Sequence, residues 1–546
     1  MRETYKAYTK DYIERKTGKG PFWAHKKQKK TNIFLITVDM LPPQFYLGAH
    51  TGINTPTLDS LRRDGIFFSN AFASAPLCGP SRASYLTGRY TYITGNSERA
   101  HDGHMTELRP NDIIWPAYLK AIGYHTRHAG KSHVGTEIFT EVFSENDAPW
   151  HRWSPPWYDD EEYLLFLKRK KLKKFTFKKE IKGVSWSGKG YGNSYGGWLA
   201  DQNGKPFPEE STYPAFLVEK AINSIENRPN PENPLYIQLD FFGPHQPFAI
   251  PGGWENRETI IRENMKLPQS WEEWAANGFN SIPNQPRVYD MYRKNWGLKE
   301  RKTLIDYRVA NQLQFELIDK LIGKYIEYLK QRNLYDDSLI IFIADHGEMN
   351  GEWGCIDKGA YLNPQVLRVP IILKLPRNYK PTVNNLSKIT DSSGVTCETP
   401  CSLLDIAPTV LEIAGIEIPE RLDGFSLLNT LTGEARPKNK PILFDVWNHV
   451  VPNPSIGMIF KSQNGKHYMY TYNTTHNIDE LYDIAPHSEL KNLFGIPEYE
   501  TLYREALIAM NECLSLDERW EVYKGYFQLE NAEKLNLPPQ DTQKFL

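Results

Sequence analysis

Three short apolar segments, each ending at an acidic residue, constrain the fold of this chain more than any other feature. They are TNIFLITVDM at 31–40, PLYIQLDFF at 234–242 and DSLIIFIADHGE at 337–348. Apolar, β-branched runs of this length are typical of strands that are buried on both faces. Between them lie helical patterns such as IDYRVANQLQFELIDKLIGKYIEYLKQRN, in which apolar residues recur every three or four positions. The alternation predicts an α/β fold with a large mixed sheet, mostly parallel, between layers of helices.

The ends of these strands predict one ligand-binding edge. The first strand ends at Asp39, the second near Asp240 and His245, and the third at Asp345 and His346. The carboxyl ends of parallel strands meet at the same edge of a sheet, and ligands bind there in open α/β folds. One strand that ends in Asp is ordinary, whereas three that end beside carboxylates and imidazoles indicate a functional site.

The length and the pattern of the chain predict two domains. The 546 residues are too many for one small core. After GEARPKNKP the pattern changes to short strand-like segments with turn residues between them: PILFDVW, SIGMIF and KHYMYTYN. We therefore predict an N-terminal extension over 1–30, a main domain over 31–436, and a smaller C-terminal α+β domain over 437–546 that contains an antiparallel sheet and a terminal extension.

The stretch over 150–200 is predicted to be an insertion. It holds a basic run, KRKKLKKFTFKK at 168–179, and a segment rich in glycine and aromatic residues, GVSWSGKGYGNSYGGW at 183–198. Two interpretations remain open. The run can be a solvated surface insertion. It can also be a lid, with cations for an anionic substrate and aromatic faces for sugar rings or aryl groups.

The charge and the cysteine content narrow the class of protein. A formal net charge of −1 argues against a general nucleic-acid binder. The N-terminal residues of the chain as given lack the apolar region of a signal peptide, and no apolar run approaches the ~20 residues that span a membrane. Five scattered cysteines, odd in number, do not form a disulfide framework. We therefore expect a cytoplasmic protein with no nucleic-acid or membrane partner.

The segment CGPSRASYLTGR at 78–89 places a cysteine at the start of a predicted helix. Pro80 suits the first turn, where its missing N–H costs nothing, and Gly88 is a typical helix end. Free N–H groups and the helix dipole at this end favour an anion. Taken alone, Cys78 could be a thiol nucleophile with a lowered pKa or simply a buried side chain.

The spacing C-x-P-S-R followed by TGR resembles the modification signature of the type I, formylglycine-dependent sulfatases of the alkaline phosphatase superfamily. The segments ITVDM, GYHTRHAGKSHVG, GPHQPF and IADHGE resemble further motifs of that family, and Lys358 follows ahead of RVPIIL at the expected distance. SLLDIAPTVLEIAGI, LDGFSLL and ELYDIAPHSELKNL resemble its later landmarks. The motifs occur in the family's order over 31–495, and this ordered set is far more specific than any one of them.

The resemblance implies a complete set of site residues and a cofactor. A maturation enzyme, either a formylglycine-generating or an anaerobic sulfatase-maturating enzyme, oxidises the cysteine to Cα-formylglycine (3-oxoalanine). An oxygen-rich ligand set favours Ca²⁺, with Mg²⁺ or Mn²⁺ as alternatives. The expected metal ligands are Asp39, Cys78, Asp345 and His346, the catalytic residues Cys78, Arg82, His133 and His245, and the substrate-binding cations Lys131 and Lys358.

The resemblance also implies a mechanism. The aldehyde at position 78 hydrates, one hydroxyl attacks sulfur, and the alcohol leaves with a proton from His245. His133 then takes the proton of the second hydroxyl, and sulfate is expelled as the aldehyde returns. Arg82 would hold the modified side chain in place. Fixed cations such as Lys131 and Lys358 suit a sulfate ester, which is an anion.

The chain departs from the family at one position, where Met40 stands in place of a second aspartate. A thioether is a poor ligand for a hard cation, so the metal's identity stays open. Relatives that hydrolyse choline sulfate or phosphonate monoesters also vary here. We predict that the chain is a sulfatase that acts on a sulfated small molecule or a sulfated carbohydrate. The alternatives are a phosphonate monoester or phosphodiester hydrolase, a silent anion- or glycan-binding relative with unmodified Cys78, and a thiol hydrolase.

Overall fold

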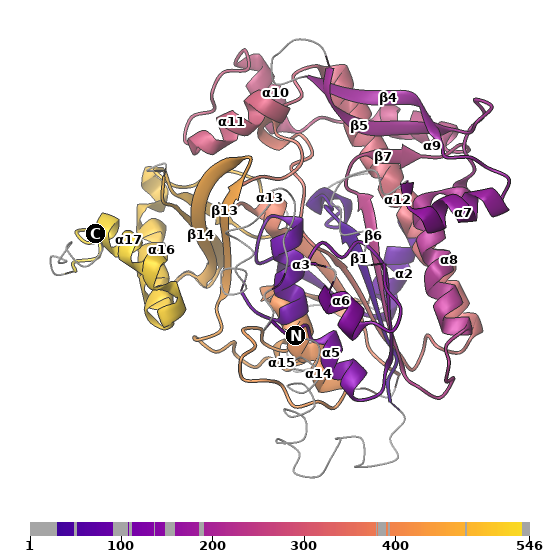
Figure 1. Ribbon diagram of the computed structural model, residues 1–546. Helices are drawn as coiled ribbons and strands as arrows, with labels where there is room; N and C mark the ends of the chain where they lie inside the picture. The colour runs from indigo at the N-terminus through magenta and orange to yellow at the C-terminus, as the bar shows by residue number, and fades with distance from the viewer. Residues whose placement is uncertain are drawn as a thin grey trace.

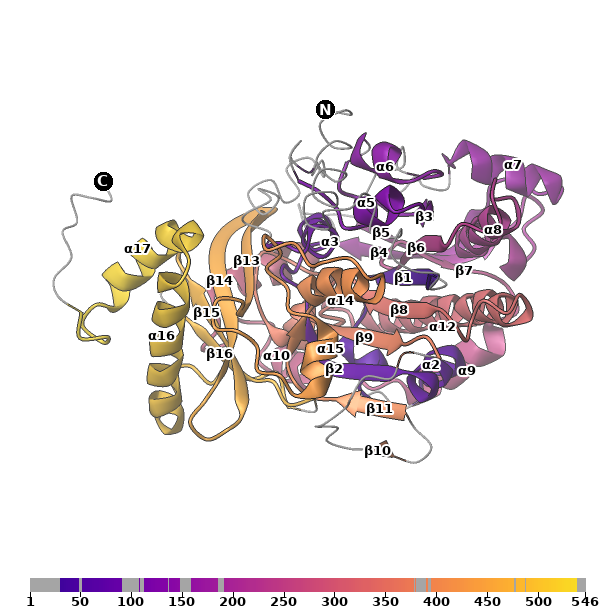
Figure 2. The same cartoon turned by 90° about the horizontal axis from the view of Figure 1, so that it is seen from below.

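A computed structural model shows a large sheet between two layers of helices, with a second sheet at the C-terminal end (Figures 1 and 2). The predicted N-terminal extension lies almost wholly outside the described residues, as do parts of the predicted insertion. The structure describes residues 30–48, 52–90, 108, 112–135, 137–147, 159–184, 191–377, 379, 389–390, 394–475, 478–486 and 488–537.

Within the described residues the main sheet has nine strands, in the order β10-β11-β2-β9-β8-β1-β6-β3, with β12 paired to β2. The neighbours β3, β6, β1 and β8 run parallel, whereas β9 is antiparallel to both β8 and β2. The predicted mixed, mostly parallel sheet is therefore confirmed. Its strands are β1 (Ile33–Asp39), β2 (Ile66–Phe72), β3 (His125–Gly130), β6 (Leu235–Pro244), β8 (Leu339–Ala344), β9 (Arg368–Lys374), β10 (Ile389–Thr390), β11 (Gly394–Cys397) and β12 (Cys401–Ser402).

The three apolar segments form the centre of this sheet. Every residue of β1, β6 and β8 is buried. Helices cover both faces, which is why these strands lack the alternation of polar and apolar residues. One layer contains α2 (Pro56–Asp64), α8 (Tyr213–Glu226) and the long α12 (Arg301–Gln331), and the other contains α3 (Cys78–Thr87), α5 (Pro116–Ala121) and α14 (Ile406–Ile413) (Figure 1).

In the described part of the chain, the C-terminal sheet consists of four antiparallel strands in sequential order. The strand-like pattern after GEARPKNKP is thus confirmed as a second sheet, while the domain boundary at 437 stays a prediction. A separate hydrophobic core joins this sheet to its two helices. The elements are β13 (Ile442–His449), β14 (Val451–Lys461), β15 (His467–Asn473), β16 (Glu480–Asp483), α16 (Glu500–Ser515) and α17 (Glu521–Asn531).

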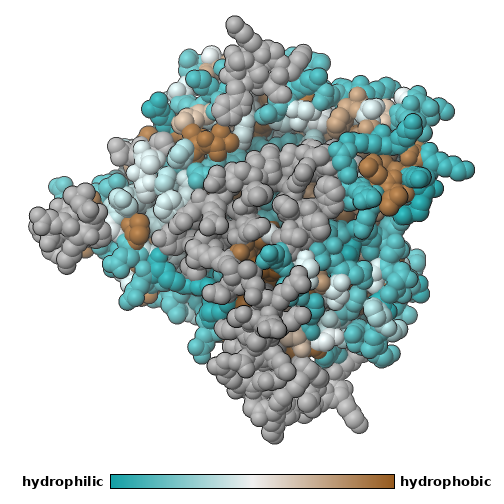
Figure 3. Space-filling model, in the orientation of Figure 1, coloured by the Kyte–Doolittle hydropathy of each residue, from teal (hydrophilic) through white to brown (hydrophobic). Residues whose placement is uncertain are grey.

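The insertion contains α7 (Glu161–Arg169) and a hairpin of β4 (Thr176–Val184) and β5 (Tyr191–Ala200). Strand β5 pairs in parallel with β7 (Phe248–Ile250), the short strand just after His245. The lysines of the basic run are exposed, and exposed leucines of α7 lie beside them; Figure 3 shows hydrophilic and hydrophobic surface side by side in this region. The exposure supports the surface interpretation, and the lid stays a prediction.

Smaller helices complete the described part of the chain. No helix among the described residues combines the length and the apolar character needed to cross a membrane. All five cysteines are buried and free of disulfide bonds. The remaining helices are α6 (Glu137–Val142), α9 (Glu255–Asn264), α10 (Gln269–Ala276), α11 (Arg287–Trp296), α13 (Pro364–Leu367) and α15 (Leu427–Thr432).

A buried carboxylate, Glu480, ties α11 to the C-terminal sheet. It accepts hydrogen bonds from the Tyr289 hydroxyl at 2.7 Å, from the Tyr482 hydroxyl, and from the Asn473 amide at 3.0 Å. Burial raises the pKa of Glu480 to about 7, although these hydrogen bonds act in the opposite direction. The folded protein therefore keeps a proton on this group to a higher pH than the unfolded chain does.

We expect Glu480 to make the protein less stable as the pH rises. A carboxyl whose pKa is raised by folding stabilises the folded state fully below its unfolded pKa, and this contribution is lost up to about pH 7. The loss is at most about 3 kcal/mol. Glu480→Gln cannot ionise, so its urea midpoint should fall less between pH 5 and pH 8. The control variant Glu498→Gln changes an exposed side chain, and its urea midpoint should vary with pH as that of the unchanged protein does. The same change of the urea midpoint with pH in all three proteins would contradict the prediction.

Candidate active site

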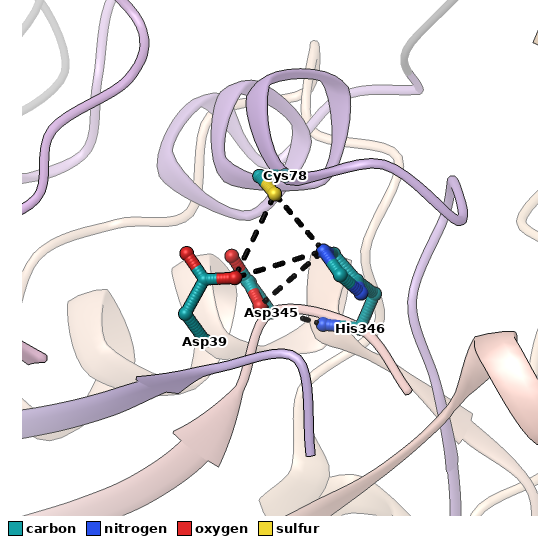
Figure 4. Close-up of side chains that lie close together, drawn as sticks. All are labelled: Asp39, Cys78, Asp345 and His346. Carbon is teal, nitrogen blue, oxygen red and sulfur yellow. Dashed lines mark hydrogen bonds and ion pairs between the residues drawn. The ribbon is translucent and has the colours of Figure 1, made fainter. Parts of the chain in front are cut away.

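Four side chains predicted to bind a metal converge at the carboxyl edge of the main sheet (Figure 4). The Cys78 sulfur lies 3.1 Å from His346 Nε2 and 3.6 Å from Asp39 Oδ1. One donor atom from each of Asp39, Cys78, Asp345 and His346 lies within 4.8 Å of all the others. All four residues are buried. The structure thus brings together the ligand set expected from the sequence.

The sheet topology produces this convergence. Strands β1 and β8 are parallel neighbours in register, with Val38 beside Ala344, so the two aspartates that follow them are adjacent. Helix α3 begins at Cys78 above this edge. It ends at Thr87 and is capped by Gly88, whose left-handed φ of 67° suits a glycine after a helix end. The Ser81 hydroxyl donates a hydrogen bond of 2.5 Å to the Asp345 carbonyl, which fixes the helix to the strand.

The donor atoms fit a divalent cation. His346 Nδ1 lies 2.8 Å from the Gly347 carbonyl and donates to it, which leaves the lone pair of Nε2 directed at the cluster. Burial lowers the pKa of His346 despite the neighbouring carboxylates, and a neutral imidazole is the form that binds metals. Asp39 and Asp345 each direct Oδ1 to the same point.

Arg82 is fully buried among carboxylates. Its Nε donates to Asp345 Oδ2 at 2.9 Å, and its terminal nitrogens lie 3.5 Å from Asp39 Oδ2 and 3.7 Å from Asp240 Oδ2. It also donates to the Lys131 carbonyl at 2.8 Å. Burial lowers the pKa of Arg82, but the carboxylates raise it further, so the pKa lies well above its ordinary value. Arg82 organises the carboxylates of the site; its direct hold on residue 78 stays a prediction.

Lys131 pairs with the first metal-ligand candidate. Its Nζ forms a buried ion pair with Asp39 Oδ2, and its backbone N–H donates to the Asp240 carbonyl at 3.1 Å. Burial raises the pKa of Asp39, but the cations around it, Lys131 first, lower it further, so the pKa lies well below its ordinary value. Asp39 is therefore an anion at any working pH.

Lys358 and His245 form a second polar group beside the cluster. Lys358 Nζ lies 2.6 Å from His245 Nε2, 3.0 Å from Asp357 Oδ1 and 3.8 Å from Met40 Sδ. His245 Nδ1 lies 2.5 Å from the Gln246 carbonyl and donates to it, so Nε2 accepts from Lys358. Burial lowers the pKa of Lys358, but Asp357 raises it further, and the amine stays protonated.

His133 lies in the loop after β3, two residues from Lys131, and is buried. Its backbone has a left-handed φ of 59°, which is uncommon outside glycine. Residues in such conformations cluster at functional sites. The placement brings His133 to the same edge as the other candidates, and its role as a base stays a prediction.

Sequence reasoning missed how Asp357 and Asp240 support the site from behind. Asp357 pairs with Lys358 and accepts a hydrogen bond of 2.5 Å from Gln246 Nε2. Asp240 Oδ2 lies 3.1 Å from His128 Nε2 and close to Arg82. The signals were weak: Asp357 adjoins a candidate lysine, and Asp240 ends a predicted strand without a motif of its own.

Comparison with known proteins identifies the family. Residues 31–416 match the model of the Sulfatase family, and residues 351–514 match that of the C-terminal region of N-sulphoglucosamine sulphohydrolase. N-acetylglucosamine-6-O-sulfatase of Bacteroides thetaiotaomicron is 23% identical over 543 residues, which cover 89% of this chain and 86% of that protein.

Solved structures show the same fold. One holds its substrate D-glucosamine-2-N,6-O-disulfate; it has a TM-score of 0.60 at 20% identity and covers 93% of this chain and 99% of its own. The phosphonate monoester hydrolase of Agrobacterium radiobacter has a TM-score of 0.61 at 19% identity and covers 89% and 95% respectively. The family match extends over most of the chain and includes every motif of the site. The chain belongs to the sulfatase family, has the alkaline-phosphatase-like fold and is a sulfuric ester hydrolase.

Proposed function

We propose that this sulfatase hydrolyses a sulfate ester of a sulfated carbohydrate, using Cα-formylglycine at position 78 and one divalent metal ion. The observation that carries the proposal is the position of Cys78, at the first residue of α3 and 3.1 Å from His346 Nε2, among the donor atoms of the metal set. The proposal requires a maturation enzyme as a partner of the newly made chain. A cytoplasmic location stays a prediction.

The cations of the site suit an anionic ester. Lys131 and Lys358 are both buried; Lys131 directly follows β3 and pairs with Asp39, and Lys358 lies beside the cluster in the segment after β8. The N-terminus of α3 adds partial positive charge at residue 78. Fixed positive charges in a water-excluded site stabilise charge that develops on sulfate oxygens, and they do so without reorganising during the reaction.

Modification and metal binding would supply the nucleophile and a Lewis acid. A hydrated aldehyde at position 78 would offer a hydroxyl for attack on sulfur, and a cation held by Asp39, Asp345 and His346 would polarise a substrate oxygen. Arg82 keeps both aspartates in place through Oδ2 of each. These contacts hold in place the carboxylates that surround residue 78.

Proton transfer to the leaving alcohol is assigned to His245 with Lys358. With Lys358 Nζ 2.6 Å from His245 Nε2, the departing oxygen would take the Nε2 proton of a protonated His245, while the ammonium of Lys358 keeps its protons and stabilises the negative charge on that oxygen. Asp357 Oδ1 lies 3.0 Å from Lys358 Nζ and holds this amine in place. His133, at the same edge, is assigned the proton of the second hydroxyl at position 78.

The substrate class is supported by relatives. N-acetylglucosamine-6-O-sulfatase and the structure with bound D-glucosamine-2-N,6-O-disulfate both concern sulfated amino sugars. A sulfated small molecule is the alternative substrate. Screening sulfated monosaccharides and oligosaccharides against an aryl sulfate distinguishes the two, because a sugar-specific site loses kcat/KM when the sugar is replaced.

A second candidate function is the hydrolysis of phosphonate monoesters or phosphodiesters. It is favoured by Met40, which removes a carboxylate from the site, and by the fold shared with a phosphonate monoester hydrolase. Matched sulfate and phosphonate esters of one alcohol should be compared by kcat/KM. We expect the sulfate ester to be the better substrate, and a higher kcat/KM for the phosphonate would reverse the assignment.

Modification of Cys78 can be measured directly. Trypsin releases the peptide from Asp64 to Arg82, and mass spectrometry of protein from the native host should show that sulfur has been replaced by an aldehyde oxygen. Cys78→Ala should keep the fold and lose turnover of sulfate esters. A thiol that is wholly alkylated by iodoacetamide would contradict the aldehyde mechanism and favour the thiol-hydrolase or silent-relative alternatives.

Asp357 should affect catalysis without touching the substrate. Asp357→Asn removes the carboxylate that holds Lys358, and we expect kcat/KM to fall about 10–100-fold, as for other residues that orient a site from behind. Asp159→Asn is the matched control, because it breaks the exposed ion pair with Lys174 instead. The expected control result is an unchanged rate. Full activity of Asp357→Asn, with Lys358→Ala inactive, would show that Lys358 needs no such partner.

A further inference from the structure

Glu348 is a buried glutamate that contacts Asp357, the partner of Lys358. It lies in the segment after β8, and none of its surface is exposed. Its Oε1 accepts a hydrogen bond of 2.6 Å from the backbone N–H of Asp357. A buried carboxyl group is costly unless hydrogen bonds compensate its loss of water. This hydrogen bond ties the beginning of the segment to the residue that directly precedes Lys358.

The backbone of Asp357 adopts a conformation that needs support. Its φ of 65° lies in the left-handed region, which is less favourable for an aspartate than for a glycine. Such conformations persist only where the surrounding contacts impose them. Two hydrogen bonds do so here, one from the Asp357 N–H to Glu348 at 2.6 Å and one from the Met349 N–H to the Asp357 carbonyl at 2.9 Å. Glu348 therefore helps to fix the conformation of Asp357.

This conformation turns the Asp357 carboxylate onto the next residue. Its Oδ1 accepts a hydrogen bond from the backbone N–H of Lys358 at 2.8 Å and lies 3.0 Å from Nζ of the same residue. That Nζ lies 2.6 Å from His245 Nε2. The hydrogen bond to Glu348 thus affects, through the backbone of Asp357, where the ammonium group of Lys358 lies beside His245.

A tyrosine joins the two contacts that hold Asp357. The Tyr307 hydroxyl lies 3.2 Å from Glu348 Oε1 and 3.3 Å from Gln246 Oε1. Gln246 Nε2 donates a hydrogen bond of 2.5 Å to Oδ2 of Asp357. Tyr307 is fully buried on the long helix α12. Asp357 is therefore held at its backbone by Glu348 and at its side chain by Gln246, and both of these residues contact one hydroxyl.

We propose that Glu348 is a positioning residue that acts through Asp357 to place Lys358 for the release of the alcohol. The proposal rests on the function proposed above, in which Lys358 and His245 serve the departing oxygen. The property that counts is the reach of an acceptor oxygen to the Asp357 N–H. The charge of the carboxyl group and direct contact with the substrate play no part in this role.

Two substitutions separate reach from charge. Glu348→Gln keeps an acceptor oxygen at the same distance from the backbone but removes the carboxyl group. Glu348→Asp keeps the carboxyl group but retracts it by one methylene. Each is made in the full chain, produced together with the maturation enzyme and loaded with metal. The two substrates are phenyl sulfate and 4-nitrophenyl sulfate, which differ only in the nitro group that makes the second phenolate the better leaving group.

Glu348→Asp should lose activity mainly on phenyl sulfate. A poorer leaving group depends more on the proton and the positive charge offered to the departing oxygen. We expect kcat/KM for phenyl sulfate to fall about 10–100-fold, as for other residues that orient a site from behind, and that for 4-nitrophenyl sulfate to fall less. Glu348→Gln should resemble the unchanged protein on both esters. A merely structural role would lower both values by the same factor, because less of the protein would be folded.

Three results would overturn the proposal: full activity of Glu348→Asp, an equal loss on both esters in that variant, or a selective loss on phenyl sulfate in Glu348→Gln. Glu480→Asp is the matched control, since it shortens an equally buried glutamate in β16. It should leave the ratio of the two kcat/KM values unchanged. Where Glu348→Asp does not fold, Tyr307→Phe removes the hydroxyl shared by Glu348 and Gln246. The same selective loss is expected there, and an unchanged ratio would overturn the proposal.

The proposed function and the positioning role fail in different proteins. Failure of the proposed function would appear in the unchanged protein, as an unmodified Cys78 peptide and no turnover of either ester. Failure of the positioning role would appear only in the variants, while the unchanged protein is modified and active.

Discussion

The guanidinium of Arg82 is the interaction on which the site depends. Carboxylates repel one another strongly where water is excluded, and an unpaired buried charge costs several kcal/mol. Arg82 meets Asp39, Asp240 and Asp345, which lie in or directly after three neighbouring strands, from a helix that begins at Cys78. A planar fork with five donors can serve several acceptors at once, which the ammonium of a lysine cannot do with the same geometry. Arg82 therefore fixes the N-terminus of α3 to the edge of the sheet. Its positive charge also compensates the negative charge of the carboxylates gathered there.

The balance of charge follows from this arrangement. Four carboxylates, those of Asp39, Asp240, Asp345 and Asp357, lie in contact with three cations, Arg82, Lys131 and Lys358. The protein groups alone are thus close to neutral. A divalent cation bound on this background would make the centre positive, as a sulfate ester requires. A second carboxylate at position 40 would offset part of that positive charge, so Met40 bears on anion binding as well as on the choice of metal.

Much of the fold and of the first layer of the site could be predicted from the sequence. The buried strands were evident because runs such as IFLITVD are apolar throughout, and parallel strands bring their ends to one edge. The direction of β9 was not evident, since an antiparallel strand inside the sheet is as apolar as a parallel one. The ion pair between Asp357 and Lys358 could not be predicted from the sequence, for another reason. Adjacent side chains usually diverge, and these meet because Asp357 has a left-handed φ of 65°.

The insertion connects to the site through its backbone, which no residue pattern revealed. Gly196 of β5 pairs with Phe248 of β7 so closely that a Cβ on Gly196 would lie 2.1 Å from the Phe248 carbonyl oxygen. The neighbouring Tyr195 packs edge-on against Tyr307, whose hydroxyl lies 3.3 Å from Gln246 Oε1.

Gln246 in turn holds Asp357, the partner of Lys358. A continuous set of contacts therefore runs from the β4–β5 hairpin to the group assigned to the leaving alcohol, and none of these contacts involves the metal set. The fold therefore links the hairpin to Lys358 by contacts that do not pass through Asp39, Asp345 or His346.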